Sequence, residues 1–207
     1  MPAEKALLIL DVDGVIFDSN ALKERNILQA ASALCDSETA QSFCRYFTRN
    51  NGLPREAKIF GYFAGREALA GELLKKYNAL NGETLHDVAF TEGALEKIQA
   101  LSHRFGLVGL SGGLETEVHE LFAHKGLSQY FFHIRGGPLT KEANLRAFTD
   151  FEIALYVGDS EADFRAARAF GIPFCFMHGY TQFEGWESFL EPYPDVHVIR
   201  HLSELAV

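Results

Sequence analysis

The stretch ALLILDVDGVIFDS, residues 6–19, places two carboxylates directly after an apolar run. Residues 6–10 are all apolar, which is typical of a parallel strand that is covered on both faces. Side chains two positions apart in a strand point the same way, so Asp11 and Asp13 can lie together at its carboxyl end, and Gly14 allows a sharp turn after them. Unpaired carboxylates are costly to bury. We therefore expect a cation, water or both at this point of the fold.

Working outward from this stretch, strand and helix patterns alternate along most of the chain. Short apolar runs predict further strands over residues 106–110, 130–134, 154–157, 174–177 and, more weakly, 196–199. Amphipathic patterns predict helices over residues 92–101, 114–125, 141–148 and 161–170. The alternation predicts an α/β fold with a doubly wound parallel sheet, a Rossmann-like core.

Residues 19–86 interrupt the alternation. They contain no good strand pattern, and they predict helices over residues 21–34, 37–48 and 67–80. A connection between parallel strands needs only one helix, so several helices indicate an inserted domain. We predict a core domain of residues 1–17 and 90–207 and an α-helical cap domain of residues 18–89. The alternative is a decorated crossover without a function.

The composition limits the partners. The chain has 207 residues and a net charge of −9, with no basic stretch, so we expect no nucleic-acid partner, and an anion site must be built locally. The apolar runs are too short to span a bilayer, and MPAEKALLIL lacks the layout of a signal peptide, so we expect no membrane association. The cysteines, at positions 35, 44 and 175, show no metal-binding spacing and indicate reduced thiols in a cytoplasmic protein.

Polar residues follow two of the other predicted strands, and a lysine begins a predicted helix. SGG follows a strand at residues 111–113, GDSEAD follows another at residues 158–163, and Lys141 begins a predicted helix. In open α/β sheets, ligands bind at the carboxyl ends of the strands. We therefore expect these groups to meet the first two aspartates at one edge of the sheet.

The chemistry that uses such a set is phosphoryl transfer with a metal ion. Asp11 and Asp159 supply the oxygen ligands that suit Mg²⁺, and an aspartate oxygen can attack phosphorus. Lys141 can neutralise the attacking carboxylate and the transferred group, and Asp13 can act as general acid and base.

A phosphate also needs hydrogen-bond donors. The Ser111 hydroxyl and the amides of Gly112 and Gly113, which we expect at the start of a helix, can hold its oxygens. A plain strand-to-helix turn is the alternative for these three residues.

These segments resemble the motifs of the haloacid dehalogenase superfamily, in its phosphatase and phosphomutase branch. DVDGVIFDS resembles the first motif, LVGLSGG the second and VGDSEADFRAA the fourth, and Lys141 fits the third. The four occur in the family's order within residues 6–18 and 106–170. The helical insert resembles the cap of the β-phosphoglucomutase and phosphoglycolate phosphatase type.

The resemblance implies a role for each motif residue. It implies that Asp11 is the nucleophile and a metal ligand, and that Asp13 is the acid/base and a metal ligand through its carbonyl. It also implies that Ser111 and Lys141 bind phosphate, that Asp159 is a Mg²⁺ ligand, and that Asp163 holds Lys141 or a metal-bound water. One position departs from the pattern, because Glu142 stands where many relatives have proline after the lysine.

The insert contains a cluster of cations around an Asn-Asn-Gly-Leu-Pro turn. These are Arg45, Arg49, Arg55 and Lys58. We predict that Arg49 and Arg55, which flank the turn, bind the part of the substrate that does not react. The alternative is a solvated loop with cations on helix surfaces.

Taken together, these features predict a Mg²⁺-dependent phosphatase that acts on a small phosphorylated metabolite, such as a sugar phosphate or a phosphoglycolate-like compound, through an aspartyl-phosphate. A hexose-phosphate mutase uses the same core and stays open as an alternative. A non-enzymatic protein that accepts phosphate or binds a phosphometabolite is a second alternative. A hydrolytic dehalogenase is disfavoured because Asp13 has no part in that chemistry. The sequence leaves the oligomeric state open.

Overall fold

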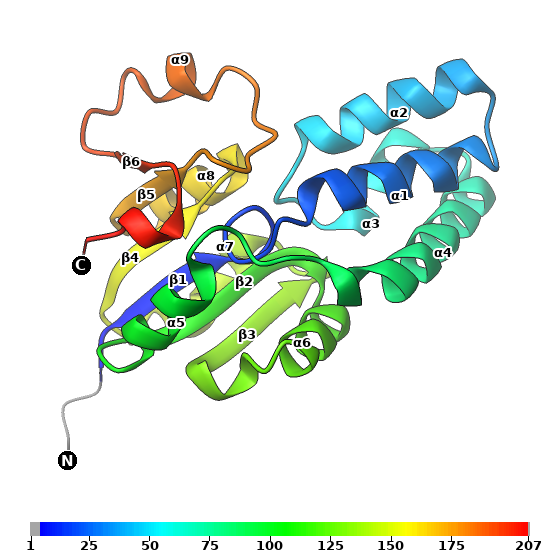
Figure 1. Ribbon diagram of the computed structural model, residues 1–207. Helices are drawn as coiled ribbons and strands as arrows, with labels where there is room; N and C mark the ends of the chain where they lie inside the picture. The colour runs from blue at the N-terminus through cyan, green and yellow to red at the C-terminus, as the bar shows by residue number, and fades with distance from the viewer. Residues whose placement is uncertain (1–4, 207) are drawn as a thin grey trace.

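A computed structural model describes residues 5–206 and places a six-stranded parallel sheet at the centre of the molecule (Figure 1). The strand order is β3-β2-β1-β4-β5-β6. The strands are β1 (Leu7–Asp11), β2 (Gly106–Leu114), β3 (Phe131–Gly137), β4 (Ile153–Gly158), β5 (Phe174–Met177) and β6 (His197–Ile199). This is the doubly wound α/β sheet that the sequence predicts, and that prediction is confirmed.

Helices cover both faces of the sheet because the central strands are apolar on both sides. Leu8 and Leu10 of β1 pack toward α5 (Ala94–Ser102) and α6 (Glu115–His124). Leu7 and Ile9 pack on the opposite face, toward α7 (Lys141–Leu145) and α8 (Glu161–Ala169). Two hydrophobic layers therefore hold β1 rigidly in the middle of the sheet.

Four helices between β1 and α5 form the insert, residues 18–89. They are α1 (Asn20–Ser32), α2 (Ser37–Arg49), α3 (Arg55–Tyr62) and α4 (Glu67–Thr84), followed by a 3₁₀ turn at Leu85–Asp87. They enclose a hydrophobic cluster of their own, centred on Phe43, Leu73 and Tyr77. In Figure 1 they lie to one side of the sheet, beyond the carboxyl ends of β1 and β2.

The two connections to the insert run side by side. The Asp18 amide donates to the Ala89 carbonyl at 3.0 Å, and the Thr91 amide donates to the Ile16 carbonyl at 3.0 Å. Paired connections and a separate hydrophobic cluster are the features expected of an inserted domain. The domain boundaries at residues 17/18 and 89/90 stay a prediction.

Three helices differ from the sequence prediction. Helix α3 was not expected, although Pro54 directly before it is a helix-start signal. The short helix α9 (Trp186–Leu190) was also missed, and the helix predicted over residues 141–148 is a short α7 followed by a 3₁₀ turn at Arg146–Phe148. Short helices are set by tertiary packing more than by a periodic pattern, and two of these have only five residues.

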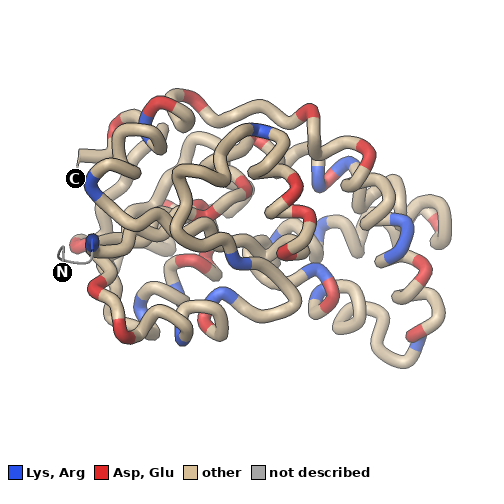
Figure 2. The backbone as a smooth tube through the Cα atoms, turned by 90° about the horizontal axis from the view of Figure 1, so that it is seen from below, with Lys and Arg blue, Asp and Glu red and all other residues tan. Residues whose placement is uncertain are grey.

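Charged residues of both signs are spread over the core and the insert (Figure 2). Lys and Arg are interspersed with Asp and Glu along the described chain. No helix among residues 5–206 combines the length and the apolar character needed to cross a bilayer.

The insert rests on the core at Gly112 of β2. A Cβ atom at this position would lie 2.9 Å from the Gly52 carbonyl oxygen and 3.0 Å from the Leu53 carbonyl oxygen. Both contacts are with backbone, so the turn would have to move away. We predict that Gly112→Ala lowers the free energy of unfolding by about 1–3 kcal/mol, the usual effect of overpacking. Hydrogen exchange at residues 50–54 should also become faster, measured together with thermal unfolding.

Gly71→Ala is the matched control, because a Cβ atom there meets nothing within 4 Å in the middle of α4. It should stabilise the protein by roughly 0.5–1 kcal/mol. An unchanged melting temperature and unchanged exchange in Gly112→Ala would show that the turn does not rest on the strand.

Candidate active site

Asp11 ends β1 at the position where the strand order reverses. Strand β1 lies between β2 and β4, and Asp11 is 3% exposed. Gly14 follows with a φ of +80°, and a Cβ atom there would lie 2.1 Å from Oδ2 of Asp159. Glycine is therefore required at this turn, because the end of β4 brings Asp159 directly beside it.

Lys141 connects two of the buried carboxylates. Its Nζ atom lies 2.6 Å from Oδ1 of Asp11 and 2.5 Å from Oδ1 of Asp163, and the side chain is 3% exposed. It is the first residue of α7, and the Thr140 side chain caps this helix by accepting the Ala143 amide at 3.2 Å. The structure thus brings Lys141 to Asp11 from a distant part of the chain.

Asp163 is held by its own element and its neighbours. Its Oδ2 atom accepts the Ser160 hydroxyl at 2.5 Å and the Ser160 amide at 3.2 Å. Its Oδ1 atom accepts hydrogen bonds from Lys141 and from the Tyr156 hydroxyl. Both oxygens are therefore engaged, so this geometry favours Asp163 as the group that orients Lys141. Its part as a metal ligand stays a prediction.

Asp159, directly after β4, is joined to the insert. Asn20, the first residue of α1, donates its side-chain amide to Oδ2 of Asp159 at 2.9 Å and to the Tyr180 carbonyl at 3.0 Å. The Thr181 hydroxyl donates to the backbone carbonyl of Asp159. Asp159 is 4% exposed, so its orientation depends on these contacts.

Asp13 is surrounded by donors. Its Oδ1 atom accepts the Ser19 hydroxyl at 2.5 Å and pairs with the Lys23 ammonium, and its Oδ2 atom accepts the Ser111 hydroxyl at 3.1 Å. Burial opposes ionisation, but the charge of Lys23 and these hydrogen bonds outweigh it and lower the pKa of Asp13 to about 2. Asp13 is therefore a carboxylate at neutral pH.

The segment from Ser111 to Gly113 differs from the expectation. We expected the strand to stop at residue 110 and a helix to follow, but β2 continues to Leu114, which pairs with Gly137 of β3, and α6 begins only at Glu115. The Gly113 amide donates to the Ser111 hydroxyl at 2.9 Å. The two glycine amides are therefore strand amides and not a helix start, although both residues line the pocket that contains the aspartates.

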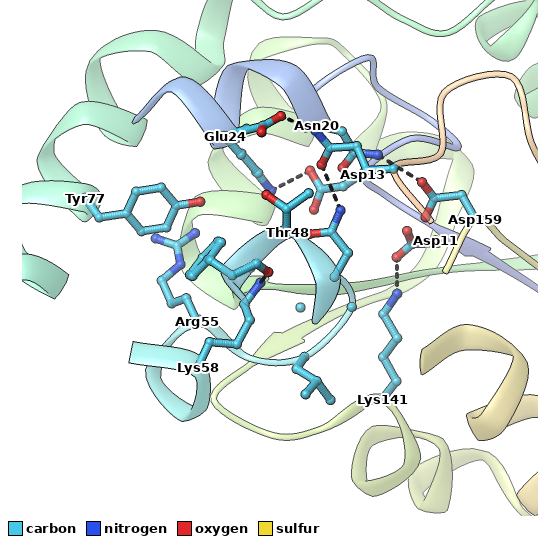
Figure 3. A pocket seen from close by; sticks show the side chains of 18 residues that line it. Asp11, Asp13, Asn20, Glu24, Thr48, Arg55, Lys58, Tyr77, Lys141 and Asp159 are labelled. Carbon is cyan, nitrogen blue, oxygen red and sulfur yellow. Dashed lines mark hydrogen bonds and ion pairs between the residues drawn. The ribbon is translucent and has the colours of Figure 1, made fainter. Parts of the chain in front are cut away.

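The opposite wall of this pocket comes from the insert (Figure 3). Lys23, Arg55, Lys58 and Tyr77 line it, facing Asp11, Asp13, Asp159 and Lys141 of the core. The empty space between these two walls is about 550 Å³, a volume that includes the open solvent at the mouth of the pocket. A molecule bound there would contact both parts of the protein.

The four insert cations of the sequence cluster separate in the structure. Arg55 and Lys58 line the pocket, whereas Arg45 and Arg49 are exposed, and Arg49 lies in a neighbouring hollow with Glu161 and Arg165. The structure thus does not bring Arg49 to the aspartates.

Arg55 reaches the pocket, but its charge already has a partner. The guanidinium forms two hydrogen bonds with the carboxylate of Glu117, at 2.7 and 2.5 Å, and a third with the Asn78 side chain at 2.7 Å. It also lies 5.0 Å from the centre of the Tyr77 ring. Because Glu117 belongs to α6, this ion pair links the insert to the core.

A comparison of the sequence with protein families gives one match. The model of the haloacid dehalogenase-like hydrolases matches residues 8–177, which include Asp11, Lys141 and Asp163. The chain belongs to this family. The resemblance inferred from the motifs is confirmed, and so is the expectation of an enzyme. Among curated proteins, none is significantly similar to this chain.

Solved structures share the fold of this haloacid dehalogenase-like hydrolase at low sequence identity. A predicted phosphoglycolate phosphatase from Haemophilus somnus has a TM-score of 0.75 at 17% identity, over 98% of this chain and 97% of its own. A predicted phosphatase from Clostridium acetobutylicum has a TM-score of 0.74 at 18% identity, over 95% and 94%. CbbY from Rhodobacter sphaeroides, solved with phosphate, has a TM-score of 0.69 at 18% identity, over 98% and 96%. At these identities the likeness shows the fold alone.

The acidic residues of this hydrolase fit a divalent cation. One oxygen from each of Asp11, Asp159 and Asp163 lies within 4.8 Å of the others, and all three residues are buried. Burial and the repulsion from Asp163 raise the pKa of Asp11 to about 8, although Lys141 opposes the shift. Burial and the charges of Asp11 and Asp163 raise the pKa of Asp159 as well. Lys141 alone cannot balance three carboxylates, and oxygen ligands of this kind suit Mg²⁺.

Several site residues were missed in the sequence. Ser19, Asn20 and Lys23 all come from the first turn of the insert, and Glu117 comes from α6. The helical spacing offered a signal for Lys23. Residues three and four apart share one face of a helix, so Lys23 lies on the same face as Asn20, next to the first motif. Glu117 had no signal, since only the packing of the insert on the core brings it to Arg55.

The raised pKa of Asp11 predicts how metal and pH act together on stability. Asp11 ionises near pH 3.8 when unfolded and near pH 8 in the metal-free fold. Its protonated form therefore stabilises the metal-free protein fully below pH 3.8, and this contribution is lost as the pH rises through about 8. A metal ion binds the ionised form, so Mg²⁺ should raise the melting temperature more at pH 8 than at pH 5. The gain at pH 8 should be about 2.7 kcal/mol when free Mg²⁺ is roughly 100 times its Kd.

Thermal unfolding in EDTA and in Mg²⁺ at the two pH values measures this difference. Asp159→Asn should abolish most of the Mg²⁺ increment. Asp150→Asn is a matched control, because Asp150 is exposed and does not line the pocket. An equal Mg²⁺ increment at both pH values would contradict the assignment of the metal to this cluster.

Proposed function

We propose that this hydrolase is a Mg²⁺-dependent phosphatase that acts on a small phosphorylated metabolite through an aspartyl-phosphate on Asp11. The observation that carries the proposal is the contact between Lys141 and Asp11. Oδ1 of Asp11 accepts the ammonium at 2.6 Å, while no residue in the described part of the chain donates to Oδ2. This oxygen is the nucleophile, and its environment is dry and positively charged on one side.

In the first half-reaction, Oδ2 of Asp11 forms a bond to phosphorus and the phosphorus–oxygen bond of the ester breaks. Lys141 compensates the charge on the phosphoryl oxygens, and Ser111 and the amides of Gly112 and Gly113 contribute hydrogen bonds. Asp13 donates a proton to the leaving oxygen, and the alcohol departs. The phosphoryl group remains on Asp11.

In the second half-reaction, a water oxygen attacks the same phosphorus and the bond to Asp11 breaks. Asp13, now a carboxylate, accepts the proton of the water. Inorganic phosphate leaves, and Asp11 is again a free carboxylate. The low pKa of Asp13 in the ligand-free site suits this base step. The acid step of the first half-reaction requires a higher pKa of Asp13, which the negative charge of a bound phosphate dianion would provide.

The metal ion would be held by Asp11, Asp159 and the backbone carbonyl of Asp13. Asp163 stays a candidate ligand next to Lys141. Bound Mg²⁺ supplies positive charge that offsets the charges of the phosphoryl group and of the carboxylates.

The first test is Asp11→Asn, which keeps the shape of the side chain and removes the nucleophile. Phosphate release from a panel of phosphorylated metabolites in Mg²⁺ should fall to background, while circular dichroism shows a folded protein. Asp150→Asn, at an exposed position, should behave as wild type. If Asp11→Asn keeps more than a few per cent of the activity, the covalent mechanism is wrong.

The second test concerns Asp13. Asp13→Asn should slow turnover by roughly 100-fold or more, because an amide can neither give nor accept the proton. The loss should be greatest for alkyl phosphates and smaller for nitrophenyl phosphate, whose leaving group needs no proton. Equal losses of kcat on the two kinds of ester would argue against a role in acid catalysis.

A further inference from the structure

Lys58 is a buried lysine that has no acidic partner within residues 5–206. It lies on α3 of the insert and is 5% exposed. Its ammonium lies 3.6 Å above the centre of the Phe47 ring and reaches the Phe47 carbonyl only at 3.4 Å. Among residues 5–206, no carboxylate forms an ion pair with it.

The other cations of the same pocket are all paired. Lys23 is bound to Asp13, Arg55 to Glu117, and Lys141 to Asp11 and Asp163. Within the described chain, Lys58 is thus the pocket-lining cation whose charge remains available to a ligand.

A lysine in this position is costly to the protein alone. Burial, followed by the charges of Lys23 and Arg55, lowers the pKa of Lys58 to about 7. An apolar side chain of similar length would pack here without that cost. An anion placed beside Lys58 would restore its charged form and recover the cost.

The location of Lys58 indicates which part of a ligand it would meet. Figure 3 shows it on the insert side of the pocket, with its side chain directed toward the interior, while Asp11 and Lys141 lie on the core side. A phosphate group at Asp11 would therefore leave Lys58 facing the other end of the same molecule.

We propose that Lys58 binds a second anionic group of the substrate, so that this enzyme selects phosphomonoesters that carry a carboxylate or a second phosphate at the end remote from the reacting phosphate. The inference rests on the proposed phosphatase function for the identity of the first group. Lys58 then determines specificity, and it takes no part in the bond-breaking steps.

Binding measured without turnover tests this assignment. In an Asp11→Asn background with Mg²⁺, calorimetry gives the Kd of two matched pairs of ligands. Phosphoglycolate against hydroxyethyl phosphate tests a carboxylate, and a hexose bisphosphate against the matching monophosphate tests a second phosphate. In at least one pair, the ligand that carries the second anionic group should bind more tightly than its matched partner. Lys58→Met should reduce that preference by about 10-fold or more, as expected for a lost hydrogen bond to a charged group.

Lys75→Met is the control, because Lys75 is an exposed cation on α4 of the same insert. It should leave all four Kd values unchanged. Lys58→Met should unfold at the same or a higher temperature than its parent, since it removes a buried unpaired charge.

The outcomes distinguish failure of the Lys58 assignment from failure of the phosphatase function. A lost preference in the first pair identifies a carboxylate, and one in the second pair identifies a phosphate. If the preference for the doubly anionic ligands survives in Lys58→Met, the proposal is overturned. The proposal is also overturned if Lys58→Met weakens both members of each pair equally and lowers the melting temperature, because Lys58 would then have a structural role. Failure of the wild type to release phosphate from any ester would instead refute the phosphatase function, while the binding ratios still decide the role of Lys58.

Discussion

The ammonium of Lys141, held between Asp11 and Asp163, is the interaction on which the site depends. Three elements must meet for it to form: the end of β1, the start of α7 and the first turn of α8. A parallel sheet brings all three to one edge. Because the partners are almost fully buried, removing one of them would leave an uncompensated charge, which usually costs about 3–5 kcal/mol. The hydroxyls of Tyr156 and Ser160 hold Asp163 in place, and Asp163 in turn orients the Lys141 ammonium toward Asp11.

The insert completes this site as well as covering it. Asn20 orients Asp159, Lys23 neutralises Asp13, and Arg55 pairs with Glu117 on the core. Each of these contacts crosses from the insert to the core, and each is polar, so water could replace it if the two parts were to separate. Apolar contacts of the same area would resist opening far more strongly. Polar pairing therefore suits a surface that has to admit and release a ligand.

Much of this could be predicted from the sequence. The apolar strand before Asp11, the acids after β4 and the alternation of strands with helices each follow from a local pattern, and all were identified. Lys141 was identified from its place at the start of a predicted helix, and it also fits a family motif. The extent of β2 was wrong because two glycines look like a turn, whereas here they allow a close approach of the insert. Arg49 and Arg55 are near each other in sequence, but only the fold determines that one is exposed and the other is buried against Glu117. Such pairings depend on how two separate hydrophobic clusters dock, and no local pattern encodes them.

The position of Lys23 bears on how one carboxylate can act as both acid and base. In the ligand-free site, Lys23 is bound to Asp13 and the pKa of Asp13 is about 2, so Asp13 carries no proton to give. A phosphate dianion in the pocket competes for the same ammonium, because Lys23 also lines the cavity. Transfer of Lys23 to a phosphoryl oxygen removes a positive charge from Asp13 and adds negative charge beside it, and both changes raise its pKa. In the mechanism proposed above, this is the direction that the acid step on Asp13 needs. Through Lys23, the insert thus sets the pKa of the carboxylate to which the proposed mechanism gives the acid and base steps.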